Sequence, residues 1–189
     1  MNSCLLPGND YPVVIILGSS GSGRTSVGQI AAQQMSAPFV ESEEVAEATL
    51  GHSIAEEFNR DSALAHAALN EAANEVLRIG GAGAGAVVAL SPSAILDEAV
   101  ARAVEECKAT GTLVVALEAS LATLAERTGL NAQRPVFMGT PRAWFRQQVA
   151  QLQAAYEEVA DQFYATDDTT PAEVGLSIAN AVRLDSSPK

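Results

Sequence analysis

A glycine-rich octet between a strand-like run and a helix-like run constrains this chain more than any other feature. Residues 12–17 are an apolar run typical of a buried parallel strand, and residues 26–34 have the composition of a helix. Between them lies GSSGSGRT, residues 18–25. In a strand–turn–helix unit, glycines let successive backbone N–H groups turn inward, and the helix dipole adds positive potential. The octet therefore predicts a phosphate-binding loop.

One position departs from the phosphate-binding pattern G-x-x-x-x-G-K-[ST]. Arg24 stands where the pattern has a lysine. Arginine keeps the positive charge, but its guanidinium is bulkier and planar. The alternative interpretation is a strand-to-helix turn that binds no ligand, and Arg24 keeps this alternative open.

Length and composition favour one globular domain. The chain has 189 residues, of which 48% are hydrophobic, and we expect a flexible leader over residues 1–11, a domain over 12–184 and a tail over 185–189. No run of 18 apolar residues and no signal-peptide pattern occurs, which favours a cytoplasmic protein without a membrane span. The two cysteines, Cys4 and Cys107, form no C-x-x-C motif, so neither a redox site nor a cysteine metal site is predicted.

The charge of the chain limits its partners. A net charge of −12 argues against binding to nucleic acid or to anionic membranes. Four arginines nevertheless fall within one 20-residue window: Arg127, Arg134, Arg142 and Arg146. This window is where we expect an anionic ligand to be held, and ordinary solvated surface charge is the alternative.

Five strand-like runs alternate with helix-like runs. The strands are expected over residues 12–18, 37–41, 86–90, 112–117 and 163–166. The helices are expected over residues 25–35, 42–50, 53–58, 61–79, 91–109, 120–128, 142–162 and 170–184, with a loop over 129–141. The order predicts a three-layer α/β domain with a five-stranded parallel sheet, and ligands should bind beyond the carboxyl ends of the strands.

Several motifs resemble those of shikimate kinase, particularly the actinobacterial type, over about residues 13–184. Besides the glycine-rich octet they are PFVESE (38–43), GHSIAEEF (51–58), RTGLNAQRP (127–135) and YEEVA (156–160). The third of these is the most specific, because it looks like the adenine-side arginine and the lid of the family. The resemblance implies a P-loop kinase fold similar to nucleoside monophosphate kinases, with a short lid at about residues 127–142.

The resemblance also implies an activity and a set of site residues. The family transfers the γ-phosphate of ATP to the 3-hydroxyl of shikimate with Mg²⁺, in aromatic amino-acid biosynthesis, and is expected to be monomeric. Carried over to this chain, the ATP-binding residues are Ser20, Gly21, Ser22, Gly23, Arg24, Thr25, Ser26, Arg127 and Pro171. Thr25 and Glu41 are expected at the metal, with Glu41 acting through water. Glu43, Ser91, Ser93 and Arg134 are expected at the substrate, and Arg24, Glu43 and Arg134 are the expected catalytic residues.

The chain departs from the family pattern mainly at functional positions. Glu41 and Glu43 replace aspartates, which moves each carboxylate outward by about 1.5 Å, and a displacement of that size costs about 100-fold in rate. Residues 91–93, Ser-Pro-Ser, replace three glycines, and the proline removes a backbone N–H. Ala67 and Leu152 stand where the family has two arginines that bind the substrate carboxylate.

The loss of these two arginines is expected to lower the affinity for the substrate. Each charge-assisted hydrogen bond contributes about 1.5–3 kcal/mol, so two losses weaken binding on the order of 100-fold to 10⁴-fold when nothing replaces them. Arg60 is the only nearby candidate for replacement in the sequence.

Other polar and aromatic residues are interpreted as structural. His66, Trp144 and Phe145 are expected to pack, and a position of Trp144 at the border of the ligand cleft is the alternative. His52 is expected in a surface loop. Four glutamates are interpreted as solvated helix faces: Glu56, Glu57, Glu157 and Glu158.

Three functions remain open from the sequence. The first is an active kinase with shikimate as its nominal substrate. The second is a degenerate paralogue that binds nucleotide but has lost shikimate phosphorylation. The third is a kinase for another hydroxylated metabolite such as gluconate.

Overall fold

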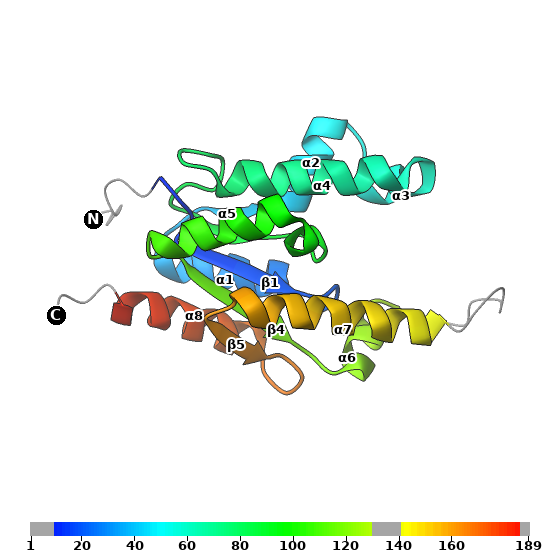
Figure 1. The fold of residues 1–189 in the computed structure, drawn as a ribbon. Coiled ribbons are helices and arrows are strands. Elements are labelled where there is room, and N and C mark those ends of the chain that lie inside the picture. Colours follow the sequence, from blue (N-terminus) through cyan, green and yellow to red (C-terminus); the bar gives the residue numbers. More distant parts are fainter. Residues whose placement is uncertain (1–9, 130–140, 186–189) are drawn as a thin grey trace.

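A five-stranded parallel sheet forms the centre of the domain. The computed structural model describes residues 10–129 and 141–185 (Figure 1). The strands are β1 (Val14–Gly18), β2 (Phe39–Glu41), β3 (Val87–Ala89), β4 (Leu113–Glu118) and β5 (Gln162–Ala165). They pair in the order β2-β3-β1-β4-β5, and every pair is parallel. The predicted α/β class with a five-stranded parallel sheet is confirmed.

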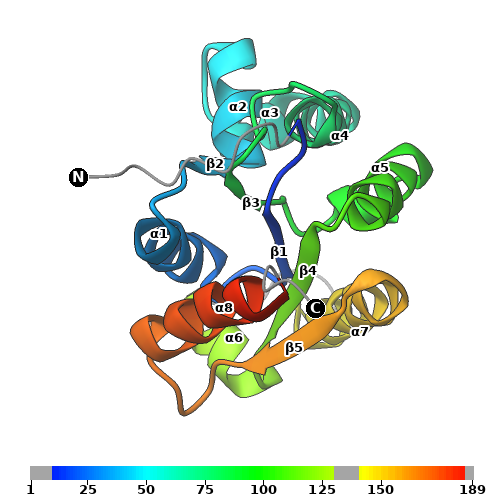
Figure 2. The same cartoon turned by 90° about the vertical axis from the view of Figure 1, so that its left-hand side faces the viewer.

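Helices cover both faces of the sheet. Figure 2 shows α1 (Arg24–Met35) and α8 (Pro171–Asp185) on one face, and α5 (Glu98–Ala109) and α7 (Pro141–Val159) on the other. Alternate residues of β1 serve the two faces, because side chains along a strand point to opposite sides. Val14 and Ile16 pack with α1 and α8, whereas Ile15 and Leu17 pack with α5 and α7. β1 is therefore apolar and buried along its whole length, as a parallel strand covered on both faces requires.

A helical layer next to β2 completes the described fold. It contains α2 (Ser42–Leu50), α3 (Ile54–Arg60) and α4 (Ser62–Leu77), which lie together in Figure 1. Ala46, Ile54 and Leu69 join the three helices in a separate small core. The shortest of these three helices, α3, starts with the predicted capping box, in which Ser53 Oγ accepts from Glu56 N at 3.2 Å. α6 (Leu121–Arg127) follows β4.

The predicted helix over residues 91–109 was wrong at its start. Residues after Ser91 form a turn and a short 3₁₀ helix, Ala94–Leu96, before α5 begins at Glu98. Asp97 is the N-cap of α5, and its carboxylate accepts from the backbone N–H groups of Ala99 and Val100. Since an aspartate that accepts two orphan N–H groups is a strong cap, it prevails over the Ser-Pro pair as the helix start.

No helix within residues 10–129 and 141–185 combines the length and the apolar character that crossing a bilayer demands. Part of the predicted lid, residues 130–140, and most of the predicted leader, residues 1–9, lie outside the described residues.

Candidate functional site

The phosphate-binding loop, residues 18–25, joins β1 to α1 as the octet predicts. Gly21 and Gly23 have φ values of 85° and 95°, a backbone conformation that glycine adopts without strain. Ser22 lies between them, and its Oγ is buried without a hydrogen-bond partner among the described residues. A turn of this shape, at the amino end of a twelve-residue helix, fits a phosphate group.

The side chain of Arg24 is directed toward the end of β3. Its Nη1 donates a hydrogen bond to the carbonyl oxygen of Leu90. Burial lowers the pKa of its guanidinium, and the nearby Tyr156 hydroxyl and the carboxyls of Glu41 and Glu43 oppose that effect. The positive charge that replaces the lysine is therefore held on the side of the loop that faces β2 and β3.

Thr25 and Glu41 meet at the carboxyl end of β2. Thr25 Oγ1 donates to Glu41 Oε1 at 2.9 Å. A hydroxyl and a carboxylate suit Mg²⁺, which usually keeps several waters and takes the remaining ligands from phosphate. Among the described residues, no group of three or more histidines, cysteines, aspartates or glutamates could hold a metal. This donor set fits a magnesium ion that arrives with a nucleotide.

A small pocket lies on one side of the phosphate-binding loop. Its volume is about 230 Å³, and it is lined by residues of the loop, α1, α6, α8 and the segment before α8: Ser22, Gly23, Ser26, Val27, Arg127, Thr166, Thr169, Pro171 and Val174. The structure thus brings five of the predicted ATP-binding residues together. We call this space the base pocket.

Arg127 ties the base pocket to the loop. Its Nη1 donates to the carbonyl oxygen of Gly21 at 3.2 Å and to Thr166 Oγ1 at 3.2 Å, and its Nη2 donates to the carbonyl oxygen of Thr166 at 2.7 Å. Asp167 next to it accepts from the backbone N–H of Ser120 and from the hydroxyl of Thr123. The Thr123 hydroxyl and then the Ser120 N–H lower the pKa of the exposed Asp167 carboxyl. These bonds fix the end of β5 against α6.

A larger cleft lies on the other side of the loop, and we call it the acceptor cleft. Its volume is about 640 Å³. Its apolar wall comes from α3, α4, α7 and the turn after β3. The residues are Ile54, Phe58, Leu69, Pro92, Trp144, Phe145, Val149 and Leu152. Its polar groups are Ser19, Ser20, Glu43, Ser62, His66, Ser91, Ser93, Thr128 and Gln148. Three of the predicted substrate residues, Glu43, Ser91 and Ser93, therefore share one cleft.

The floor of the acceptor cleft is held by buried hydrogen bonds. The N–H of Ser91 donates to Ser42 Oγ at 2.9 Å, and the Tyr156 hydroxyl donates to the carbonyl oxygen of Pro92 at 3.0 Å. Ser91 Oγ is buried without a partner among the described residues. Burial raises the pKa of the Glu43 carboxyl, although Arg24 lowers it. Glu43 is thus a carboxylate of raised basicity beside the loop, which suits a group that accepts a proton or a hydrogen bond from a hydroxyl.

Two residues that were interpreted as packing residues, His66 and Trp144, also line the acceptor cleft. His66 is exposed, lines the acceptor cleft, and meets the Phe58 ring edge-on with 5.0 Å between ring centroids. Trp144 also lines the cleft and is 63% exposed. The sequence held one clue to both positions, because His66 lies near the start of α4 and Trp144 directly follows the predicted lid. Packing was nevertheless the expected role, since it is the usual role of such residues.

Neither position of the missing arginines is rescued by Arg60. Leu152 is buried and lines the acceptor cleft, whereas Ala67 is exposed next to His66. Arg60, at the end of α3, is exposed and does not line the cleft. Arg134 lies outside the described residues, so its predicted role stays a prediction.

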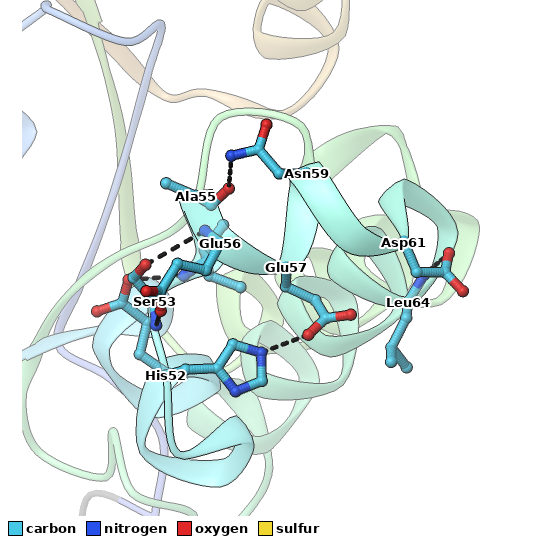
Figure 3. A network of polar contacts seen from close by, with 10 residues as sticks. His52, Ser53, Ala55, Glu56, Glu57, Asn59, Asp61 and Leu64 are labelled. Atoms are coloured by element: carbon cyan, nitrogen blue, oxygen red, sulfur yellow. Dashed lines mark hydrogen bonds and ion pairs between the residues drawn. The ribbon is translucent and has the colours of Figure 1, made fainter.

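A polar network supports the α2–α3 corner beside the cleft (Figure 3). His52 Nε2 contacts Glu57 Oε2, and Glu47 Oε1 accepts from the N–H of Ile54 at 2.8 Å. The interpretation of Glu57 as a solvated helix face was wrong, because Glu57 is only 4% exposed. His52 supplies the partner that a buried carboxylate requires.

Comparison with known proteins assigns this arrangement to a family. The family model described as shikimate kinase matches residues 20–183. The chain belongs to the shikimate kinase family. A shikimate kinase from Streptomyces coelicolor is 34% identical over 173 residues, which cover 92% of this chain and 96% of that protein. One from Salinispora arenicola is 32% identical over 168 residues, covering 89% of this chain and 96% of that protein.

Solved structures of the family share the fold. The shikimate kinase from Acinetobacter baumannii, solved in complex with shikimate, has a TM-score of 0.79 at 19% identity and covers 95% of this chain. The alignment spans 97% of that structure. The shikimate kinase from Aquifex aeolicus has a TM-score of 0.66 at 17% identity, with 92% and 97% of the two chains covered. The resemblance to the actinobacterial shikimate kinases and to a P-loop kinase fold is thereby confirmed.

Proposed function

We propose that this member of the shikimate kinase family transfers the γ-phosphate of ATP to a hydroxyl of a small molecule, with the 3-hydroxyl of shikimate as the nominal acceptor. One observation carries the proposal: the phosphate-binding loop separates two clefts and lines both. Ser22 and Gly23 line the base pocket, and Ser19 and Ser20 line the acceptor cleft. A loop in this position holds the transferred phosphate between donor and acceptor, as phosphoryl transfer requires.

Each group of site residues has its own role in the proposed reaction. Backbone N–H groups of residues 20–25 hold the phosphates, and Arg127 and Pro171 border the base. Thr25 and Glu41 would hold Mg²⁺, which neutralises phosphate charge when bound. Glu43 accepts the hydrogen bond of the reacting hydroxyl and takes up its proton. Ser91 and Ser93 border the acceptor, and Arg134 is proposed to meet the transferring phosphate.

An assay of acceptor-dependent ADP formation tests this function. Mg-ATP and shikimate are mixed with the protein, and shikimate 3-phosphate is identified by mass spectrometry. We expect product with the natural chain and a loss of at least about 100-fold with Glu43→Gln, which cannot accept the proton. Turnover that does not exceed the rate without protein would reject shikimate as the acceptor.

A second candidate function is nucleotide binding without phosphoryl transfer. The bond from Arg24 to the Leu90 carbonyl favours it, because that guanidinium is engaged away from the base pocket. Arg24→Lys separates the two functions. Faster transfer by this variant would indicate that arginine limits catalysis, whereas shikimate phosphorylation by the natural chain at an ordinary kinase rate would reject the second function.

A further inference from the structure

The acceptor cleft has an unusual balance of charge for a site that would bind a carboxylate. Among the described residues that line it, none is lysine or arginine, and the single carboxylate is Glu43. Much of its wall is aromatic or aliphatic, including Phe58, Trp144 and Leu152. The described part of the cleft is therefore apolar with hydrogen-bonding groups and one negative charge.

Four described arginines close to the cleft in the sequence motifs are not among its lining residues. Arg24 donates to the Leu90 carbonyl, and Arg127 donates to Gly21 and Thr166. Arg60 and Arg146 are exposed and do not line the cleft. None of these four residues lines the cleft beside Phe58 or Leu152.

An anionic acceptor would lose free energy in this cleft. A carboxylate that leaves water beside Phe58 or Leu152, where no described lysine or arginine lines the cleft, pays its desolvation. A neutral ring that bears hydroxyls avoids this cost. Its hydroxyls can donate to Glu43, and its carbon skeleton can pack against Phe58 and Leu152.

We propose that the preferred acceptor is a neutral, hydroxyl-bearing small molecule with an apolar body, such as an uncharged alicyclic or aromatic alcohol. The proposal rests on the phosphoryl transfer proposed above and names its substrate class. It predicts discrimination against the carboxylate form of an otherwise identical ring.

Calorimetry with two matched ligands tests the proposal. Shikimate and its neutral carboxamide differ in charge but hardly in shape, and each is titrated into the protein with a non-hydrolysable ATP analogue. We expect the carboxamide to bind at least about tenfold more tightly, as one unpaired charge predicts. Equal or tighter binding of shikimate overturns the proposal, and so does the absence of binding by both. Binding of the carboxamide without its phosphorylation supports the acceptor class and counts against the proposed transfer.

A variant that introduces a cation beside the cleft, with a matched control elsewhere, provides a second test. Ala67 is exposed and adjoins His66 on the cleft wall, so Ala67→Arg adds a cation at the rim without opening the core. Ala150→Arg is the control, because Ala150 is exposed on α7 outside the cleft lining and adds the same charge. Ala67→Arg should shift the ratio of affinities toward shikimate by about tenfold or more, and Ala150→Arg by less than about twofold. Equal ratios in the two variants overturn the proposal.

Discussion

Arg24 couples the two sides of the phosphate-binding loop through its position beside Glu43. The guanidinium is bound to the Leu90 carbonyl, directly before the serine that lines the acceptor cleft. The arginine therefore contributes to the charge of the acceptor side. A sequence shows the change from lysine to arginine but cannot show that the side chain is directed toward β3.

Removal of the Arg24 charge should raise the pKa of Glu43 further. Burial already raises the pKa above the ordinary glutamate value of 4.5, Arg24 lowers it, and Glu41 and Glu47 raise it. In a carboxyl-carbon NMR titration we expect the Glu43 midpoint above 4.5 in the natural chain and higher in Arg24→Gln, with Arg24→Lys as the charge-retaining control. Because the folded pKa is raised, protonated Glu43 favours the folded state below its unfolded pKa, and this contribution is lost as pH rises through the folded pKa. A midpoint that does not move in Arg24→Gln would contradict this geometry.

Arg127→Ala should weaken nucleotide binding. The variant loses the bonds that join the loop carbonyl of Gly21 to the end of β5. We expect affinity for a fluorescent ATP analogue to fall by about 10- to 100-fold, the loss of one charged hydrogen-bonding group. Arg146→Ala is the control, since Arg146 is exposed and lines neither cleft. An equal effect of both variants would mean that Arg127 acts only through net charge.

At the scale of elements, the α2–α3 corner depends on the contact of His52 with the buried Glu57. His52→Ala leaves a carboxylate with 4% exposure without this partner, which should lower the free energy of unfolding by about 1–3 kcal/mol. Urea unfolding measures the change. The double variant His52→Ala/Glu57→Gln should recover part of it, because a neutral amide costs less to bury than a charge. A double variant whose free energy of unfolding is no higher than that of His52→Ala would show that the two side chains do not interact.

Strong local signals made most elements predictable. Apolar runs of β type, the glycine-rich turn and the capping boxes at Ser53 and Thr170 identify elements that the structure contains. The start of α5 was missed because two competing caps, Ser91 and Asp97, lie six residues apart. The burial of Glu57 was not predicted, because the sequence alone did not distinguish it from its exposed neighbour Glu56.

The phosphate-binding loop was predictable because it depends on consecutive residues. Thr25 and Glu41 are 16 residues apart, and their meeting was expected only from the family resemblance. The cleft-lining positions of His66 and Trp144 depend on how α4 and α7 approach each other across the loop, which is a tertiary property that one sequence does not encode locally.

The whole molecule places a base pocket and an acceptor cleft on opposite sides of one loop. The base side keeps Arg127, Pro171 and the glycines. The described residues that line the acceptor cleft include no lysine or arginine, and Leu152 is one of its apolar residues. We therefore expect the nucleotide to be retained while the acceptor class has diverged.

Calorimetric titration of ATP, with and without Mg²⁺, tests the central claim that a loop carrying Arg24 still binds a nucleoside triphosphate. The account predicts one saturable site per chain, with tighter binding in the presence of Mg²⁺, which Thr25 and Glu41 would hold. Thr25→Val, which removes the metal-binding hydroxyl, should abolish the Mg²⁺-dependent part. No saturable heat under either condition would contradict the claim.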